Sequence, residues 1–184
     1  MATSGRLILI DPIAYPQELP RIIRFASGAF GGAMARFSSP YFIVRRNVRQ
    51  VYGDPDRPTE AVIQRYHELL LREGHREAMT EYFKVLRKYS TDDSLARRVA
   101  DIQAPTLLMW GSEDRWVPPE LIDRWRADVP QLEVTTYPGA GHVPMEEFPE
   151  ETAADAHAFL AATPPATAQP PTLPAHTSGM PSWQ

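Results

Sequence analysis

The chain has 184 residues, of which 43% are hydrophobic, and its net charge is −4 at pH 7. This length allows one domain with a buried core. The small acidic excess argues against nucleic acid as a partner, because no basic surplus is available to neutralise phosphates. The absence of cysteine excludes disulfides, thiolate metal sites and a cysteine nucleophile. No apolar run approaches the roughly 20 residues that span a bilayer, so we expect a cytoplasmic protein without a membrane span.

The first apolar run, Leu7–Ile10, is closed by Asp11 and a proline. Continuous apolar character without polar alternation predicts a strand that is buried on both faces. Residues 15–32 contain several prolines and glycines, which tend to interrupt helices and strands. Apolar residues at helical spacing predict helices beyond that point. The expected helices cover residues 40–52, 59–73 and 78–90, with Thr59 as the N-cap of the second and Gly74 as its end.

The segment 106–151 contains an apolar run at residues 106–110 and a second short run, VTTY, at residues 134–137. Asp114 comes after the first run, and His142 comes after the second. Parallel strands carry their functional loops at their carboxyl ends, so we expect these two side chains to lie side by side. Two further helices are expected, over residues 119–129 and 149–162, the second with Phe159 and Leu160 facing inward.

An aspartate held against a histidine is the orienting half of a nucleophilic catalytic triad. His142 would have to lie on a tight turn, and Gly139 and Gly141 supply the backbone freedom that such a turn needs. A non-catalytic interpretation is also open, in which Asp114 caps the following turn and His142 packs on the surface.

The motifs around this pair have a known counterpart. Residues 110–118 read WGSEDRWVP and residues 139–150 read GAGHVPMEEFPE, with Asp114 and His142 28 positions apart. In this order they resemble the acid and histidine segments of the α/β-hydrolase superfamily. The resemblance implies that Asp114 is the triad acid and His142 the general base.

The fold that the resemblance implies is α/β: a partial α/β-hydrolase fold with a short parallel sheet of about three strands. It also implies a division of the chain. Residues 1–12 would hold the first core strand, residues 13–100 a helical cap, and residues 101–162 the core segment with the acid and the histidine. Residues 163–184 are rich in proline, alanine and threonine, and we expect a disordered tail there.

The sequence departs from the family pattern at the nucleophile. No Gly-x-Ser-x-Gly elbow occurs in it, and Ser112 lies only two residues before the acid. The oxyanion-hole donors belong to the same missing region. We therefore expect the C-terminal half of a hydrolase that is inactive alone. A truncated hydrolase, one half of a split protein and a repurposed binding module remain open. Asp11, after the earlier strand, is a second candidate acid.

The implied reaction is hydrolysis of an ester or a similar small apolar substrate by a Ser-His-Asp mechanism. The alternatives are an epoxide hydrolase or haloalkane dehalogenase with an aspartate nucleophile, and a non-catalytic binding module. We expect no metal, because the histidines at 67, 75, 142, 157 and 176 lack ligand spacing. We expect no cofactor either, because no Gly-x-Gly-x-x-Gly follows a strand.

The strand at residues 7–10 would lack a neighbour on one side. Such an edge leaves backbone hydrogen-bonding groups unpaired and favours association with another chain. We therefore expect the protein to be poorly soluble, partly molten, or self-associated through this edge.

Overall fold

The computed structural model describes residues 5–162, so the predicted tail at residues 163–184 lies outside the described residues. The described part of the chain contains three strands, eight α-helices and one 3-10 helix. Their bounds, in chain order, are β1 Leu7–Ile10, α1 Arg21–Ala26, α2 Ala29–Phe37, α3 Tyr41–Val51, α4 Glu60–Leu71, α5 His75–Tyr89, η1 Ala96–Asp101, β2 Thr106–Gly111, α6 Leu121–Asp128, β3 Leu132–Tyr137, α7 Pro144–Glu147 and α8 Pro149–Ala161.

The three strands form one parallel sheet in the order β1-β2-β3. Leu7 pairs with Thr106 in the register of β1 on β2, and Thr106 pairs with Leu132 in the register of β2 on β3. Every residue of the central strand β2 is buried, as its uninterrupted apolar sequence requires. The prediction that the strand at residues 7–10 is buried on both faces is wrong, because all four residues of β1 are only partly buried at the edge of the sheet. The predicted α/β class and the short parallel sheet of about three strands are confirmed, and the strands lie in the sheet in the order in which they follow in the chain.

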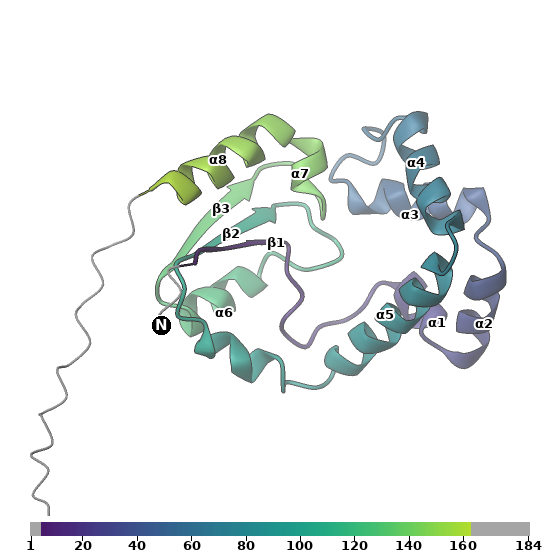
Figure 1. Ribbon diagram of the computed structural model, residues 1–184, viewed down its shortest axis with the longest axis horizontal. Coiled ribbons are helices and arrows are strands. Elements are labelled where there is room, and N and C mark those ends of the chain that lie inside the picture. The colour runs from purple at the N-terminus through teal and green to yellow at the C-terminus, as the bar shows by residue number, and fades with distance from the viewer. Residues whose placement is uncertain (1–4, 163–184) are drawn as a thin grey trace, which may run out of the picture.

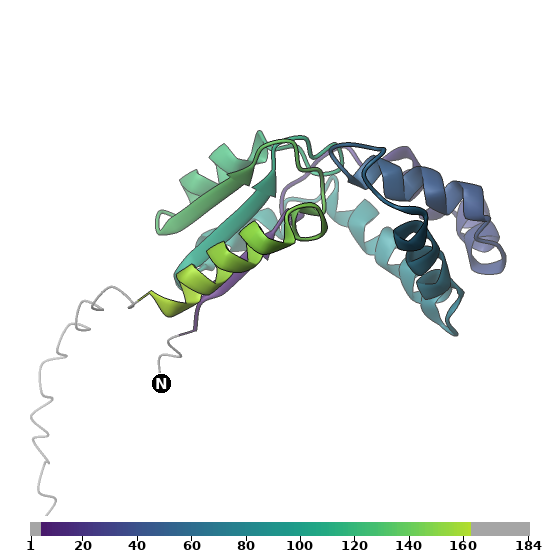
Figure 2. The same ribbon diagram turned by 90° about the horizontal axis from the view of Figure 1, so that it is seen from above.

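Helices cover both faces of the sheet. Leu108 and Trp110 of β2 point to one face, where they pack with Trp125 of α6 and with η1. Leu107 and Met109 point to the other face, where they pack with Phe159 of α8. Figure 1 and Figure 2 show α6 and α8 on opposite sides of the strands. The sheet therefore has two separate apolar cores, as a parallel sheet buried on both faces must have.

The helices α1 to α5, which together we call the five-helix segment, lie between β1 and β2 in the sequence. In space they lie beyond the carboxyl ends of the strands and beside the sheet (Figure 1, Figure 2). Their own apolar clusters include Val44, Val48 and Ile63 in α3 and α4. No helix within residues 5–162 is both long enough and apolar enough to cross a membrane.

Two details of the five-helix segment differ from the sequence prediction. Helices α1 and α2 lie where no helix was predicted, in and just after the stretch that is rich in proline and glycine. Gly31 lies inside α2, and this position requires glycine because a Cβ would be 2.0 Å from the carbonyl oxygen of Phe25. Gly74 does not end α4, which stops at Leu71. With a φ of 73°, Gly74 instead precedes α5.

The predicted N-cap at Thr59 is confirmed. Its hydroxyl accepts a hydrogen bond from the amide of Val62 at 3.3 Å, in the first turn of α4. At the C-terminal end of the described residues, the prediction for α8 needs one correction. Phe159 faces the core, whereas Leu160 is 57% exposed.

Candidate active site

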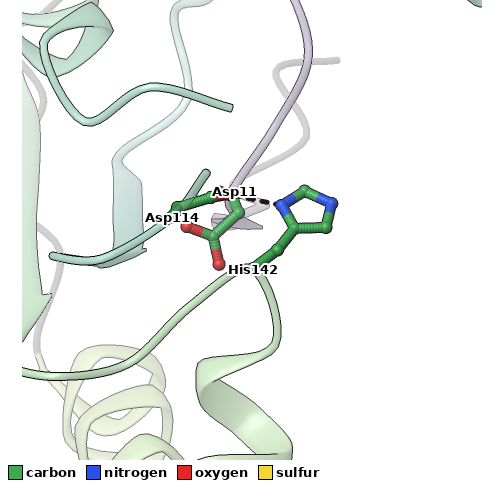
Figure 3. A group of neighbouring side chains, drawn as sticks. All are labelled: Asp11, Asp114 and His142. Carbon is green, nitrogen blue, oxygen red and sulfur yellow. Dashed lines mark hydrogen bonds and ion pairs between the residues drawn. The ribbon is translucent and has the colours of Figure 1, made fainter. Parts of the chain in front are cut away.

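Three ionisable side chains meet at the carboxyl edge of the sheet. Asp11 follows β1, Asp114 follows β2 and His142 follows β3. Each side chain offers a ligand atom, and these atoms lie within 4.8 Å of one another. Figure 3 shows the three side chains converging from three different segments. The structure thus brings together the two residues predicted from the strand ends, and it adds Asp11 to them.

Asp114 is held rigidly and is shielded from water. Its side chain is 0% exposed. One carboxylate oxygen, Oδ1, accepts hydrogen bonds from the amides of Trp116 at 2.7 Å and Val117 at 2.9 Å. The other oxygen, Oδ2, lies 2.8 Å from Nδ1 of His142. Asp114 therefore caps the following turn and also binds the histidine, so the two interpretations of this residue are compatible.

The His142 ring is oriented from several sides. A carboxylate can only accept, so Nδ1 carries the hydrogen of the bond to Asp114 and Nε2 is left as an acceptor. The indole of Trp116 stacks on the imidazole, with ring centroids 5.9 Å apart and planes inclined by 23°. The amide of His142 donates to the carbonyl oxygen of Val51 at 2.6 Å. A neutral imidazole in this tautomer is set up to accept a proton at Nε2.

The turn before His142 uses its two glycines differently. Gly139 has a φ of 80°, which favours glycine, as the sequence predicts. Gly141 has no such φ. It is required because a Cβ would lie 2.3 Å from the carbonyl oxygen of Val51. The helix α3 thus approaches the histidine turn so closely that only glycine fits there.

Asp11 is a buried and strained residue. It is the only non-glycine residue among residues 5–162 with a positive φ, at 42°, a conformation that costs energy and often marks a functional position. Its Oδ1 accepts from the amide of Gly111 at 3.0 Å, while its Oδ2 is buried without a hydrogen-bond partner. Burial and the neighbouring Asp114 carboxylate raise the pKa of Asp11 to about 8. No hydrogen bond joins Asp11 to His142 in the described chain, and Asp114 makes that contact.

The same cluster is the one group among residues 5–162 whose atoms could converge on a metal ion. Its existing hydrogen bonds occupy most of the possible ligand atoms. Both oxygens of Asp114 and Nδ1 of His142 are engaged, and so is Oδ1 of Asp11. A cation would have to displace the bond between Asp114 and His142, so the donor set fits an acid–base pair better than a metal centre.

A cavity of about 610 Å³ extends from this site into the five-helix segment. Its lining is mainly apolar and comes from all five helices together with Trp116, His142 and Val143. Ile23, Val48 and Leu86 are buried members of that lining. An apolar cavity of this size that includes a potential proton acceptor is typical of a small-molecule site.

The hydroxyls of Ser112 and Ser27 have other partners. The hydroxyl of Ser112 accepts from the amide of Gly139 at 2.9 Å and so ties the two loops together. The hydroxyl of Ser27 donates to the carbonyl oxygen of Arg24 at 3.1 Å. Within residues 5–162 no serine, threonine or tyrosine hydroxyl is hydrogen-bonded to the His142 ring.

Sequence reasoning missed two residues that shape this site. Trp116 stacks on His142, and Glu147 accepts from the amide of Gly141 at 2.6 Å. Tryptophan and glutamate are common in loops and short helices, so neither residue type signals such a role. A signal for Glu147 exists only in the structure, where its side chain is 1% exposed.

A sequence profile described as the Alpha/beta hydrolase family matches residues 1–156. The chain belongs to the α/β-hydrolase family. Among curated relatives of this family, Lipase 1 of Psychrobacter immobilis is 36% identical over 78 residues, which are 41% of this chain and 25% of the lipase. A 2-hydroxy-6-oxononadienedioate/2-hydroxy-6-oxononatrienedioate hydrolase of Cupriavidus pinatubonensis is 31% identical over 154 residues, 76% of this chain and 53% of that enzyme.

Solved structures support the same α/β-hydrolase fold. A 2-hydroxy-6-oxo-6-phenylhexa-2,4-dienoate hydrolase from a Rhodococcus species superposes with a TM-score of 0.67 at 14% sequence identity. The alignment covers 85% of this chain and 55% of that structure. The chain thus spans between a quarter and about half of the length of these relatives.

Proposed function

We propose that this α/β-hydrolase chain supplies the acid–base half of an ester-hydrolysing site. The observation that carries the proposal is the hydrogen bond of 2.8 Å between the fully buried Asp114 carboxylate and Nδ1 of His142. In a triad, the aspartate fixes the histidine tautomer and stabilises the imidazolium that forms. His142 would accept the proton of an attacking nucleophile at Nε2 and return it to the leaving group.

The nucleophile and the oxyanion-hole donors in this proposal come from outside residues 5–162. Support comes from the His142 ring, which has no hydroxyl partner among the described residues, and from the absence of a Gly-x-Ser-x-Gly elbow in the sequence. Residues 5–162 alone would then bind substrate without turning it over. Activity would require a serine placed within hydrogen-bonding reach of Nε2.

The five-helix segment acts in this proposal as the cap over the site. The cavity it forms is lined by apolar side chains, and His142 is part of the lining. Burying an apolar acyl or alkyl group there would be favourable by about 25 cal/mol for each Å² removed from water. The substrate class is therefore a small apolar ester or a related compound that places its reacting carbon beside His142.

A second candidate is a reaction that begins with an aspartate nucleophile, as in dehalogenation. The observation that favours it is a relative named haloalkane dehalogenase 2, from Mycobacterium tuberculosis, which is 30% identical over 139 residues, 70% of this chain and 48% of that protein. The Asp114–His142 pair serves either nucleophile, so the pair does not discriminate between them. A non-catalytic module that binds apolar ligands is the third candidate.

An assay of the purified chain tests the proposal. We expect no turnover of p-nitrophenyl butyrate or 1-chlorohexane above the buffer rate, together with binding of butyrate or hexanol in the cavity, seen as shifts of the His142 ring signals in NMR spectra. Turnover that disappears in His142→Ala would contradict the inactivity of the isolated chain. Binding that leaves His142 unperturbed would favour a module that does not use the pair.

A further inference from the structure

The last residue of α3 and the two residues after it make hydrogen bonds to His142 and to the short helix α7 that follows it. The carbonyl oxygen of Val51 accepts from the His142 amide at 2.6 Å. The hydroxyl of Tyr52 donates to Glu146 at 2.7 Å, and the amide of Gly53 donates to Glu147 at 3.1 Å. The five-helix segment and the histidine are thus joined by polar contacts as well as by apolar packing.

Glu146 accepts hydrogen bonds from α4 and from Tyr52, the residue that follows α3. Besides Tyr52, it accepts from the hydroxyl of Tyr66 at 2.8 Å and from the guanidinium of Arg65 at 2.8 Å, both in α4. Burial and the Glu146 carboxylate raise the pKa of both tyrosines, so the phenols remain donors across the neutral range. Hydrogen bonds to a charged acceptor are roughly twice as strong as neutral ones. Glu146 therefore fixes α3 and α4 to the helix that follows His142.

Glu147 completes the connection from the buried side. Its side chain accepts from the amide of Gly141, directly before His142, and from the amide of Gly53, two residues after the end of α3. A carboxylate shared by these two amides keeps the two backbones at a fixed separation. We call the group of Tyr52, Arg65, Tyr66, Glu146 and Glu147 the clasp.

The helices held by the clasp also line the apolar cavity. Val44, Val48 and Val51 of α3 and Tyr66 of α4 are part of its lining. A ligand that fills the cavity presses on these side chains, and α3 continues from there to the His142 amide. The cavity and the imidazole are therefore connected through one helix and one pair of carboxylates.

We propose that Glu146 is a positioning residue, which makes the placement of His142 depend on how α3 and α4 are seated around the cavity. This inference rests on the proposed function for the role of the cavity, and on the hydrogen bonds of Glu146 and Glu147 for the clasp. Through the clasp, a ligand that seats α3 and α4 also steadies the histidine turn. Occupancy of the cavity and orientation of the imidazole would then be coupled.

Amide hydrogen exchange of the full chain tests the clasp without any ligand. In Glu146→Ala we expect the amides of His142 and Gly141 to exchange about tenfold faster or more, while amides in the middle of β2 keep their rates. The matched control is Glu150→Ala, which removes an exposed glutamate in the first turn of α8. This variant should leave all these exchange rates unchanged. Unchanged exchange at His142 in Glu146→Ala would overturn the proposal.

Titration with 1-octanol then tests the coupling. In the wild-type protein and in Glu150→Ala, octanol should shift the His142 ring signals together with the methyl signals of Val44 and Val48. In Glu146→Ala the valine shifts should remain, and the His142 shift should fall by about half or more. An undiminished His142 response would contradict the coupling.

Tyr66→Phe provides a milder variant where Glu146→Ala fails to fold, because it removes one donor and keeps the ring in its apolar cluster. We expect it to speed His142 exchange by less than the alanine variant does, and a wild-type rate would again overturn the proposal. Should octanol leave every wild-type signal unchanged, the proposed cavity would be wrong, and the exchange comparison would still decide the role of Glu146.

Discussion

Asp114→Ala is expected to lower the free energy of unfolding by about 3–5 kcal/mol. The carboxylate is fully buried and accepts from the amides of Trp116 and Val117 as well as from Nδ1 of His142. Alanine would leave all three donors without their shared partner at a position where the carboxylate itself is fully buried. Urea unfolding followed by tryptophan fluorescence and far-UV circular dichroism measures the loss.

Asp114→Asn is the informative companion variant. Its amide oxygen can still accept from the backbone at the Oδ1 position, so we expect a loss of about 1–3 kcal/mol, confined to the contact with His142. A loss in Asp114→Asn as large as in Asp114→Ala would mean that the histidine contact, and not the turn cap, dominates the stability of this loop. A loss below about 1 kcal/mol in the alanine variant would contradict the buried geometry.

Asp11→Asn is expected to change how stability depends on pH. The folded protein holds the Asp11 proton up to about pH 8, whereas the unfolded chain releases it near pH 3.8. Between pH 3.8 and pH 8, folding therefore takes up one proton at Asp11. Over that range Asp11 lowers the equilibrium constant for folding by up to roughly tenfold for each rise of one pH unit. Asparagine cannot ionise, and it keeps an oxygen that accepts from the Gly111 amide. The free energy of unfolding of Asp11→Asn, relative to that of the wild-type protein, should therefore increase from pH 5 to pH 8.

Urea unfolding at pH 5, 6.5 and 8 measures this difference between the variant and the wild-type protein. The matched control is Asp123→Asn, whose side chain is 87% exposed in α6. It should follow the wild-type dependence on pH. Parallel stability curves for Asp11→Asn and the wild-type protein would show that Asp11 is already ionised in the folded state, contrary to its burial beside Asp114.

The sheet and the meeting of Asp114 with His142 could be predicted from the sequence because short-range patterns encode them. The uninterrupted apolar run of β2 marks a strand that is buried on both faces, and a polar residue just after a strand of a parallel sheet must lie at its carboxyl edge. The motifs around the two residues then identified the family. The helix at residues 149–161 was also predictable, although its burial pattern did not place Leu160 correctly.

Features that depend on packing between separate helices and strands were not predictable in this way. The glycines in α2 appeared to break a helix, yet Gly31 is what lets that helix contact the backbone of Phe25. The environment of Asp11 depends on β2 and on Asp114, which lie about a hundred residues away in the sequence. Glu146 accepts from Tyr52 and Tyr66, and Glu147 accepts from Gly53. These partners lie 80 to 94 residues away in the sequence, a distance over which no local pattern carries information.

The central claim is that Asp114 holds the His142 ring in one tautomer, with the hydrogen on Nδ1. Two-bond proton–nitrogen NMR correlation of histidine-labelled protein measures this directly. We predict the Nδ1–H tautomer for His142 and a low-field Nδ1 proton signal, both of which disappear in Asp114→Ala. An Nε2–H tautomer in the wild-type protein, or a spectrum that the substitution leaves unchanged, would contradict the account.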